Sequence, residues 1–276
     1  MFSRQIGRNA GRLLSQASRS TTTVNTTTVN TSRTYATGAA RGTSQLRKVA
    51  FVTIYGFAFA FAGAFGTYQA IRLQGMGFTS DEASLRAFVP PDTEARRADE
   101  TINAHPLVQE LRRRGDLTES RPHMKMPAEY RSRSLTAGTL IGHRKVPVPP
   151  YAWSDDAGTE LVSVTFVGED LCGHPGLVHG GMLATMLDEG LARCCMKALP
   201  NKLCVTANLN IDYRKPTPAG SFLVLKARTT KVQGRKAWVK GHIELLAGPG
   251  ETPVVVAEAS GLFIEPKYAA MMPRIV

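Results

Sequence analysis

The stretch Val178–Asp188, with the sequence VHGGMLATMLD, decides the fold and marks a candidate site. Gly180 and Gly181 stand before an apolar run with helical spacing, so they are expected to begin a helix. The first turn of a helix has unpaired backbone N–H groups and the positive end of the helix dipole, and both stabilise a bound oxyanion. Asp188 lies two turns further on, where burying an unpaired carboxylate is costly. The stretch therefore predicts a site that polarises a carbonyl and activates water nearby.

The apolar periodicity predicts that this helix runs from Gly180 to about Leu199, where Pro200 and Asn201 stop it. Glu189 and Arg193 form an i,i+4 ion pair on another face, and Glu189 is expected at the surface. Residues 160–167 alternate as a strand before the helix. Four strand-like runs follow it, at 203–213, 222–232, 237–246 and 253–264, with a hairpin turn at 233–235.

This order predicts an α+β protein with the hotdog fold, because a long apolar helix in an otherwise antiparallel protein must be covered. The antiparallel sheet is expected to curve around the helix, with its four later strands in a meander. The domain is predicted to span residues 151–268, with a tail at 269–276. Residues 72–150 are predicted as a connector. It is expected to contain two short helices: one capped by a Thr79/Glu82 capping box, and one beginning at Pro106. An extended stretch is predicted at 135–150.

The net charge of +12 is concentrated at the N-terminus. Residues 1–48 hold eight Lys or Arg and no Asp or Glu, so the basic charge gives no argument for nucleic-acid binding. A segment rich in Arg, Ser and Thr without acid is typical of a mitochondrial presequence. Arg33-Thr34-Tyr35-Ala36 resembles a matrix-processing site. The alternative is a basic arm that stays attached.

Residues 49–71 contain no charge, and 23 residues are enough to cross about 30 Å of hydrocarbon as a helix. Arg47, Lys48 and Arg72 flank the segment, and Tyr55 and Tyr68 suit the interfaces. These features predict a single transmembrane anchor. The alternative is a buried or peripheral helix of a soluble protein.

The four cysteines have neither metal-ligand spacing nor an obvious disulfide framework, so we interpret them as reduced core thiols without a nucleophilic role. They are Cys172, Cys194, Cys195 and Cys204. The sequence offers no metal-ligand cluster.

Four motifs resemble hotdog-fold acyl-CoA thioesterases, nearest to the mitochondrial thioesterase-superfamily-member-4 and -5 type and the phenylacetate-pathway type. They are GLVHGG at 176–181, ATMLD at 184–188, TANLNIDY at 206–213 and VQGRK at 232–236. The resemblance covers about residues 161–264. The basic tail and predicted anchor are similar to those of membrane-attached fungal members.

The resemblance implies a role for each candidate residue. Gly180 and Gly181 would supply oxyanion contacts, Asp188 would be base or nucleophile, Thr206 would orient it or water, and His179 would order the turn or contact the carbonyl. Relatives often have an Asn where this chain has Gly173, and the neighbouring His174 is a candidate substitute. The further substrate-binding candidates are Asn208, Gly234, Arg235 and Lys236.

The predicted function is hydrolysis of a medium- or long-chain fatty acyl-CoA without metal or cofactor, with an aryl-CoA left open. The resemblance implies a homodimer or dimer of dimers, with the site shared between subunits. The alternatives are a non-catalytic hotdog protein that binds acyl-CoA or scaffolds a membrane assembly, in which Asp188 is structural, and a hydratase, for which no His–acid motif is visible. The predicted location is the mitochondrial inner membrane. Which side of the membrane the domain faces is left open.

Overall fold

The computed structural model describes residues 42–73 and 77–272. The chain divides into two compact units, one ending at Phe57 and the other beginning at Ala58. Most of the predicted presequence and the last four residues lie outside the described residues.

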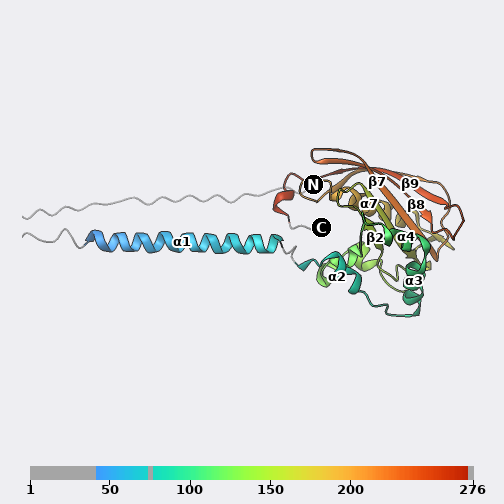
Figure 1. Cartoon of the computed structure of the whole chain (residues 1–276), viewed down its shortest axis with the longest axis horizontal. Helices are drawn as coiled ribbons and strands as arrows, with labels where there is room; N and C mark the ends of the chain where they lie inside the picture. The colour runs from blue at the N-terminus through green and yellow to red at the C-terminus, as the bar shows by residue number, and fades with distance from the viewer. Residues whose placement is uncertain (1–41, 74–76, 273–276) are drawn as a thin grey trace, which may run out of the picture. The chain divides into compact units, whose positions relative to one another are not determined.

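Helix α1 (Gly42–Leu73) is one continuous helix of 32 residues (Figure 1). It contains the predicted span and begins earlier, at Gly42, so that Arg47 and Lys48 belong to it. Residues Gln45–Ala70 are long and apolar enough to cross a membrane, and their most apolar 18-residue window has a mean hydropathy of 1.8. Phe57, Phe59 and Phe61 are all more than 70% exposed. So large an apolar surface is unfavourable in water and calls for a cover of lipid or protein.

One long helix packed against a curved antiparallel sheet forms the centre of the fold, as predicted for a hotdog protein. Helix α7 (Gly180–Met196) lies beneath strands of the sheet (Figure 1). Every neighbouring pair in the sheet is antiparallel. In spatial order the strands are β1 (Thr118–Ser120), β2 (Tyr151–Ser154), β3 (Glu160–Val167), β7 (Ser221–Gln233), β8 (Lys236–Leu245), β9 (Val255–Ile264) and β6 (Val205–Tyr213).

The core lies between α7 and the inner face of the sheet. Leu183, Leu187 and Leu191 on α7 are buried against residues of β7, β8 and β9. Gly190 lets the helix approach β7, because a Cβ there would lie 2.6 Å from Leu225 Cδ1. This packing fixes the rotation of α7 about its axis, and with it the direction of Asp188.

The prediction of a four-strand meander is wrong for β6. Strand β3 pairs with β7 along eight residues, from Glu160–Arg228 to Val167–Ser221, and so occupies the edge of β7. Strand β6 instead pairs with β9. Among the described strands it is the end of the sheet opposite β1, so the edge of β6 away from β9 is unpaired.

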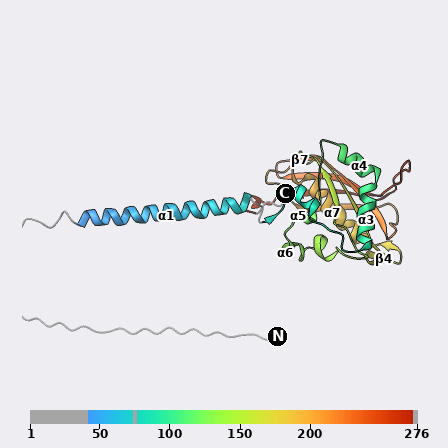
Figure 2. The same cartoon turned by 60° about the horizontal axis from the view of Figure 1, so that its bottom comes forward.

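The segment before residue 151 contributes more to the fold than a connector would. Strand β1 extends the sheet, and helices α3 (Thr93–Ala104) and α4 (Pro106–Arg113) cover its outer face (Figure 2). Trp153 and Ile102 are fully buried in this second core. The helix start at Pro106 is confirmed, whereas α3 was not predicted.

Shorter elements complete the described fold. Helix α2 (Asp81–Arg86) is capped by Ser80 and not by the predicted Thr79, because the Ser80 hydroxyl accepts the Ala83 N–H. A π-helix (Leu135–Thr139) interrupts the stretch predicted to be extended. The remaining elements are α5 (Pro122–Lys125), α6 (Ala128–Arg131), the hairpin strands β4 (Cys172–His174) and β5 (Leu177–Val178), and 3₁₀ turns at Glu169–Leu171 and Ala269–Met271.

Candidate active site on helix α7

The start of α7 presents one free backbone donor. His179 is the N-cap, and its Nδ1 accepts the Gly181 N–H at 2.8 Å. Among the described residues no acceptor lies within hydrogen-bonding reach of the Gly180 N–H. The Tyr213 hydroxyl donates to the Gly180 carbonyl at 2.9 Å and fixes this turn. Within the described part of the chain the Gly180 N–H is therefore free, while the Gly181 N–H is already paired.

The hydrogen bond from the Gly181 N–H also fixes which nitrogen of the neutral His179 ring carries the proton. Because Nδ1 accepts a hydrogen bond, the neutral ring carries its proton on Nε2, which can donate to a substrate. Gly173 lies directly against this ring, where a Cβ would be 2.9 Å from His179 Cδ2. Because real Cβ atoms do not come so close, a side chain at position 173 would require the His179 ring to shift. His174, the next residue of β4, is exposed.

Asp188 and Thr206 lie in contact, since the Thr206 hydroxyl donates to Asp188 Oδ1 at 2.7 Å. A β-bulge in β6 brings Thr206 to Asp188. Thr206 pairs with Phe263 and Asn208 with Leu262, so Ala207 is the extra residue. The bulge turns Thr206 toward the inner face, which faces α7.

The same bulge places Asn208 on the outer face, where it accepts a hydrogen bond from Asn210 at 2.6 Å. The structure thus separates Asn208 from Asp188. The other predicted substrate-binding residues form the β7–β8 turn, with Gly234 at φ +57°. The Arg235 guanidinium donates to the Glu265 carbonyl at 2.7 Å.

Register places this turn at the Thr206 end of the sheet. Lys236 and Val205 both pair with Ile264, from opposite sides of β9. Two strand spacings separate them, roughly 10 Å. The turn is therefore near the candidate site without contacting Asp188.

Glu189 is not the surface residue that the sequence predicted. Its Oε1 accepts hydrogen bonds from Arg193 at 2.6 Å and from His123 of α5 at 2.9 Å. Burial opposes the charged form of Glu189, but Arg193 and the His123 hydrogen bond outweigh burial and hold its pKa well below the ordinary value. The predicted Glu189–Arg193 pair is present, and His123 joins it because α5 lies beside α7.

The described cysteines are free thiols. Burial raises the pKa of Cys194 to about 11, which suits a core thiol and not a nucleophile. Cys195 is also buried, whereas Cys172 and Cys204 are only half-buried.

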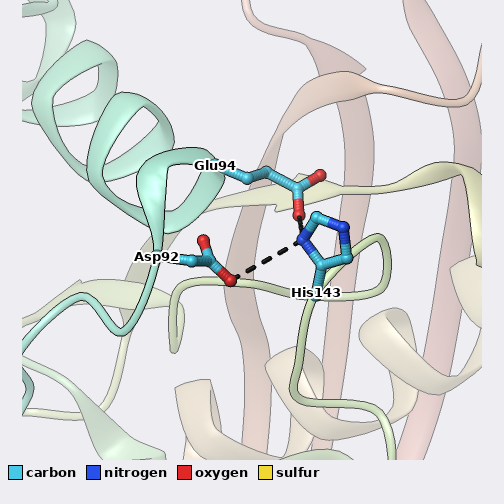
Figure 3. Close-up of side chains that lie close together, drawn as sticks. All are labelled: Asp92, Glu94 and His143. Carbon is cyan, nitrogen blue, oxygen red and sulfur yellow. Dashed lines mark ion pairs between the residues drawn. The ribbon is translucent and has the colours of Figure 1, made fainter.

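A third group of titratable side chains lies away from α7 (Figure 3). His143 Nδ1 is 2.8 Å from Glu94 Oε2 and 3.6 Å from Asp92 Oδ2. The carboxylates have other partners, since Asp92 caps α3 through Ala95 and Glu94 accepts the Arg144 N–H. These contacts link α3 to the loop that carries His143, and this structural role explains why the three side chains lie together.

Residues 175–263 match the thioesterase superfamily. An uncharacterized protein of Schizosaccharomyces pombe is 34% identical over 163 residues, which cover 59% of this chain and 90% of that protein. The chain therefore belongs to the thioesterase superfamily. It spans 64% and 65% of the length of two further fungal relatives.

Two other relatives bear on activity and location. The acyl-coenzyme A thioesterase THEM4 of Bos taurus is 37% identical over 36% of this chain and 38% of its own length. The uncharacterized mitochondrial membrane protein FMP10 of Saccharomyces cerevisiae is 28% identical over 83% of this chain and 91% of its own. Among solved structures, a phenylacetic acid degradation-related protein of Ralstonia eutropha is 29% identical, covering 40% of this chain and 78% of that one, with a TM-score of 0.34.

Proposed function

We propose that the protein is an acyl-CoA thioesterase that hydrolyses a medium- or long-chain fatty acyl-CoA to the free acid and CoA. The observation that carries the proposal is the Asp188–Thr206 contact on α7, the helix whose first N–H, at Gly180, has no acceptor among the described residues. The THEM4 relative, named as an acyl-coenzyme A thioesterase, supports the same activity.

In the proposed reaction Asp188 takes a proton from water as the water oxygen attacks the thioester carbonyl carbon. The resulting oxyanion accepts the Gly180 N–H, and His179 Nε2–H is a second donor. The C–S bond then breaks, and the CoA thiolate takes the proton from Asp188. Direct attack by Asp188 on the carbonyl carbon is the other route: it would expel the CoA thiolate and form an acyl-enzyme anhydride. Water then hydrolyses the anhydride to the free acid and the Asp188 carboxylate, and the thiolate takes the proton that is released. In both routes the Thr206 hydroxyl holds one carboxylate oxygen and leaves the other for chemistry.

The geometry of α7 favours a site shared by two subunits. Gly180 and Asp188 are eight residues apart on one helix, which is about 12 Å along its axis. One thioester carbonyl cannot lie within reach of both. A partner subunit would supply the missing group, and the unpaired edge of β6 offers backbone groups for pairing with a second copy.

Three residues of the β7–β8 turn are proposed to bind the CoA moiety. Arg235 and Lys236 are exposed cations at the Thr206 end of the sheet, and Gly234 permits the turn. Positive charge there suits CoA phosphates. His174 remains a candidate contact at the rim, where it is exposed.

Replacing Thr206 with valine is expected to lower kcat about tenfold to a hundredfold with little change in KM, because a hydrogen bond to a charged group is lost. Steady-state hydrolysis by the full chain in detergent micelles measures this. Thr101→Val, on the exposed side of α3, is the matched control and should keep wild-type kcat. An unchanged kcat in Thr206→Val would remove Thr206 from the proposed mechanism.

The same proposal places the protein in the mitochondrial inner membrane, with α1 as a single span. The chain expressed in yeast is expected to stay with mitochondrial membranes after alkaline carbonate extraction, while a chain lacking residues 49–71 is released. Release of the full chain would contradict the anchor. Protease digestion of mitoplasts reports the side, since only a domain in the intermembrane space is cleaved.

A further inference from the structure

A cavity of about 60 Å³ lies on the side of α7 that carries Glu189. The buried α7 residues Leu183, Leu187 and Leu191 do not line it. Its walls are α7, the inner face of β3, and the segment from α5 to β2. That segment lies outside the stretch matched by the thioesterase superfamily. Most of the lining is apolar, with Met182, Met186, Leu140 and Val146 among it. Methionine side chains adapt readily to a bound group.

One wall of the cavity adjoins the candidate active site. Thr185 lines it and lies on α7 between Gly181 and Asp188, and Met182 is in the first helical turn. A group bound near the start of α7 can therefore extend into this space. The volume accommodates about four water-sized groups, which suits part of an acyl chain.

His123, which is only 6% exposed, is one of the polar residues that line the cavity, together with Glu189 and Arg193. The ionised Glu189 can only accept, so His123 Nε2 donates to it at 2.9 Å. In the neutral ring Nδ1 is then an acceptor. This atom is buried, and no described residue lies within hydrogen-bonding distance of it. An unpaired buried acceptor is energetically unfavourable and favours a ligand that supplies a donor.

We propose that this cavity receives the acyl group of the substrate and that His123 selects acyl groups bearing a hydroxyl, which donates to Nδ1. This inference rests on the proposed thioesterase function and narrows its substrate class. Glu189 and Arg193 act as positioning residues, because Glu189 holds the ring by its other nitrogen and Arg193 in turn holds Glu189.

The test compares kcat/KM for pairs of acyl-CoA esters of equal length, with and without a hydroxyl at successive positions. At the favoured position the wild-type chain is expected to prefer the hydroxylated ester by about tenfold to a hundredfold. His123→Leu should abolish this preference, so that the two esters of each pair have equal kcat/KM in this variant. The carboxylate of Glu189 stays paired with Arg193 in this variant. His143→Leu, an exposed histidine elsewhere, is the matched control and should keep the preference.

A binding measurement separates this proposal from the thioesterase proposal. Calorimetric titration of Asp188→Asn with the same ester pairs is expected to show tighter binding of the hydroxylated ester, and adding His123→Leu should remove the difference. That result supports the cavity assignment even if no ester is hydrolysed. Equal binding of both esters at every hydroxyl position, or a preference that survives His123→Leu, would overturn it.

Discussion

Asp188→Asn is expected to lower kcat for acyl-CoA hydrolysis by about a thousandfold or more, since general-base catalysis alone contributes about a hundredfold to ten-thousandfold. Asparagine keeps the size of the side chain and can still accept from the Thr206 hydroxyl, which lies 2.7 Å from Oδ1. It neither takes a proton from water nor attacks a thioester. The loss is therefore expected in kcat, with acyl-CoA binding retained.

The control for this variant is Asp156→Asn, in which the same chemical change is made at a carboxylate that is 93% exposed and pairs with Lys197. It should retain wild-type kcat. Circular dichroism and the sedimentation coefficient must match among the three proteins. A fully folded Asp188→Asn protein with wild-type kcat would show that Asp188 is structural.

Leu187→Ala is expected to reduce the free energy of unfolding by about 2–5 kcal/mol, because it removes buried methyl groups and leaves a cavity. Leu187 is fully buried between α7 and the sheet. It precedes Asp188, so loss of its packing also loosens the helix turn that carries the carboxylate. Urea denaturation followed by tryptophan fluorescence, at one fixed protein concentration, measures the change.

Val89→Ala is the comparison for Leu187→Ala, because Val89 is 79% exposed. Its effect should remain within about 0.5 kcal/mol. Equal stability of Leu187→Ala and wild type would contradict the assignment of α7 as the centre of the core.

Periodicity predicted the elements whose apolar residues are large and regularly spaced. Strand β3 occupies 160–167 as predicted, and α7 begins at Gly180. Helix α3 escaped prediction because two of its three buried residues are Ala95 and Ala98, which give a weak apolar signal. The edge position of β6 was also missed, because local alternation carries no information about which strands pair.

The candidate site was predictable only in part. Asp188 stood out as an acid in an apolar helix, and the family resemblance singled out Thr206 as the residue that orients either Asp188 or water. The bulge at Ala207, which separates the directions of Thr206 and Asn208, has no sequence signal of its own. His123 is 66 residues from Glu189, and tertiary packing alone brings them together.

The reaction of the full chain with acyl-CoA in ¹⁸O-labelled water is the most direct test of the thioesterase assignment. Free CoA and free fatty acid, quantified together by mass spectrometry across acyl chain lengths, should appear in equal amounts. Over many turnovers the acid should carry one oxygen from the labelled water, and medium or long chains should react fastest. Acyl-CoA that stays intact in the presence of the folded protein would contradict the assignment and favour the non-catalytic acyl-CoA-binding role.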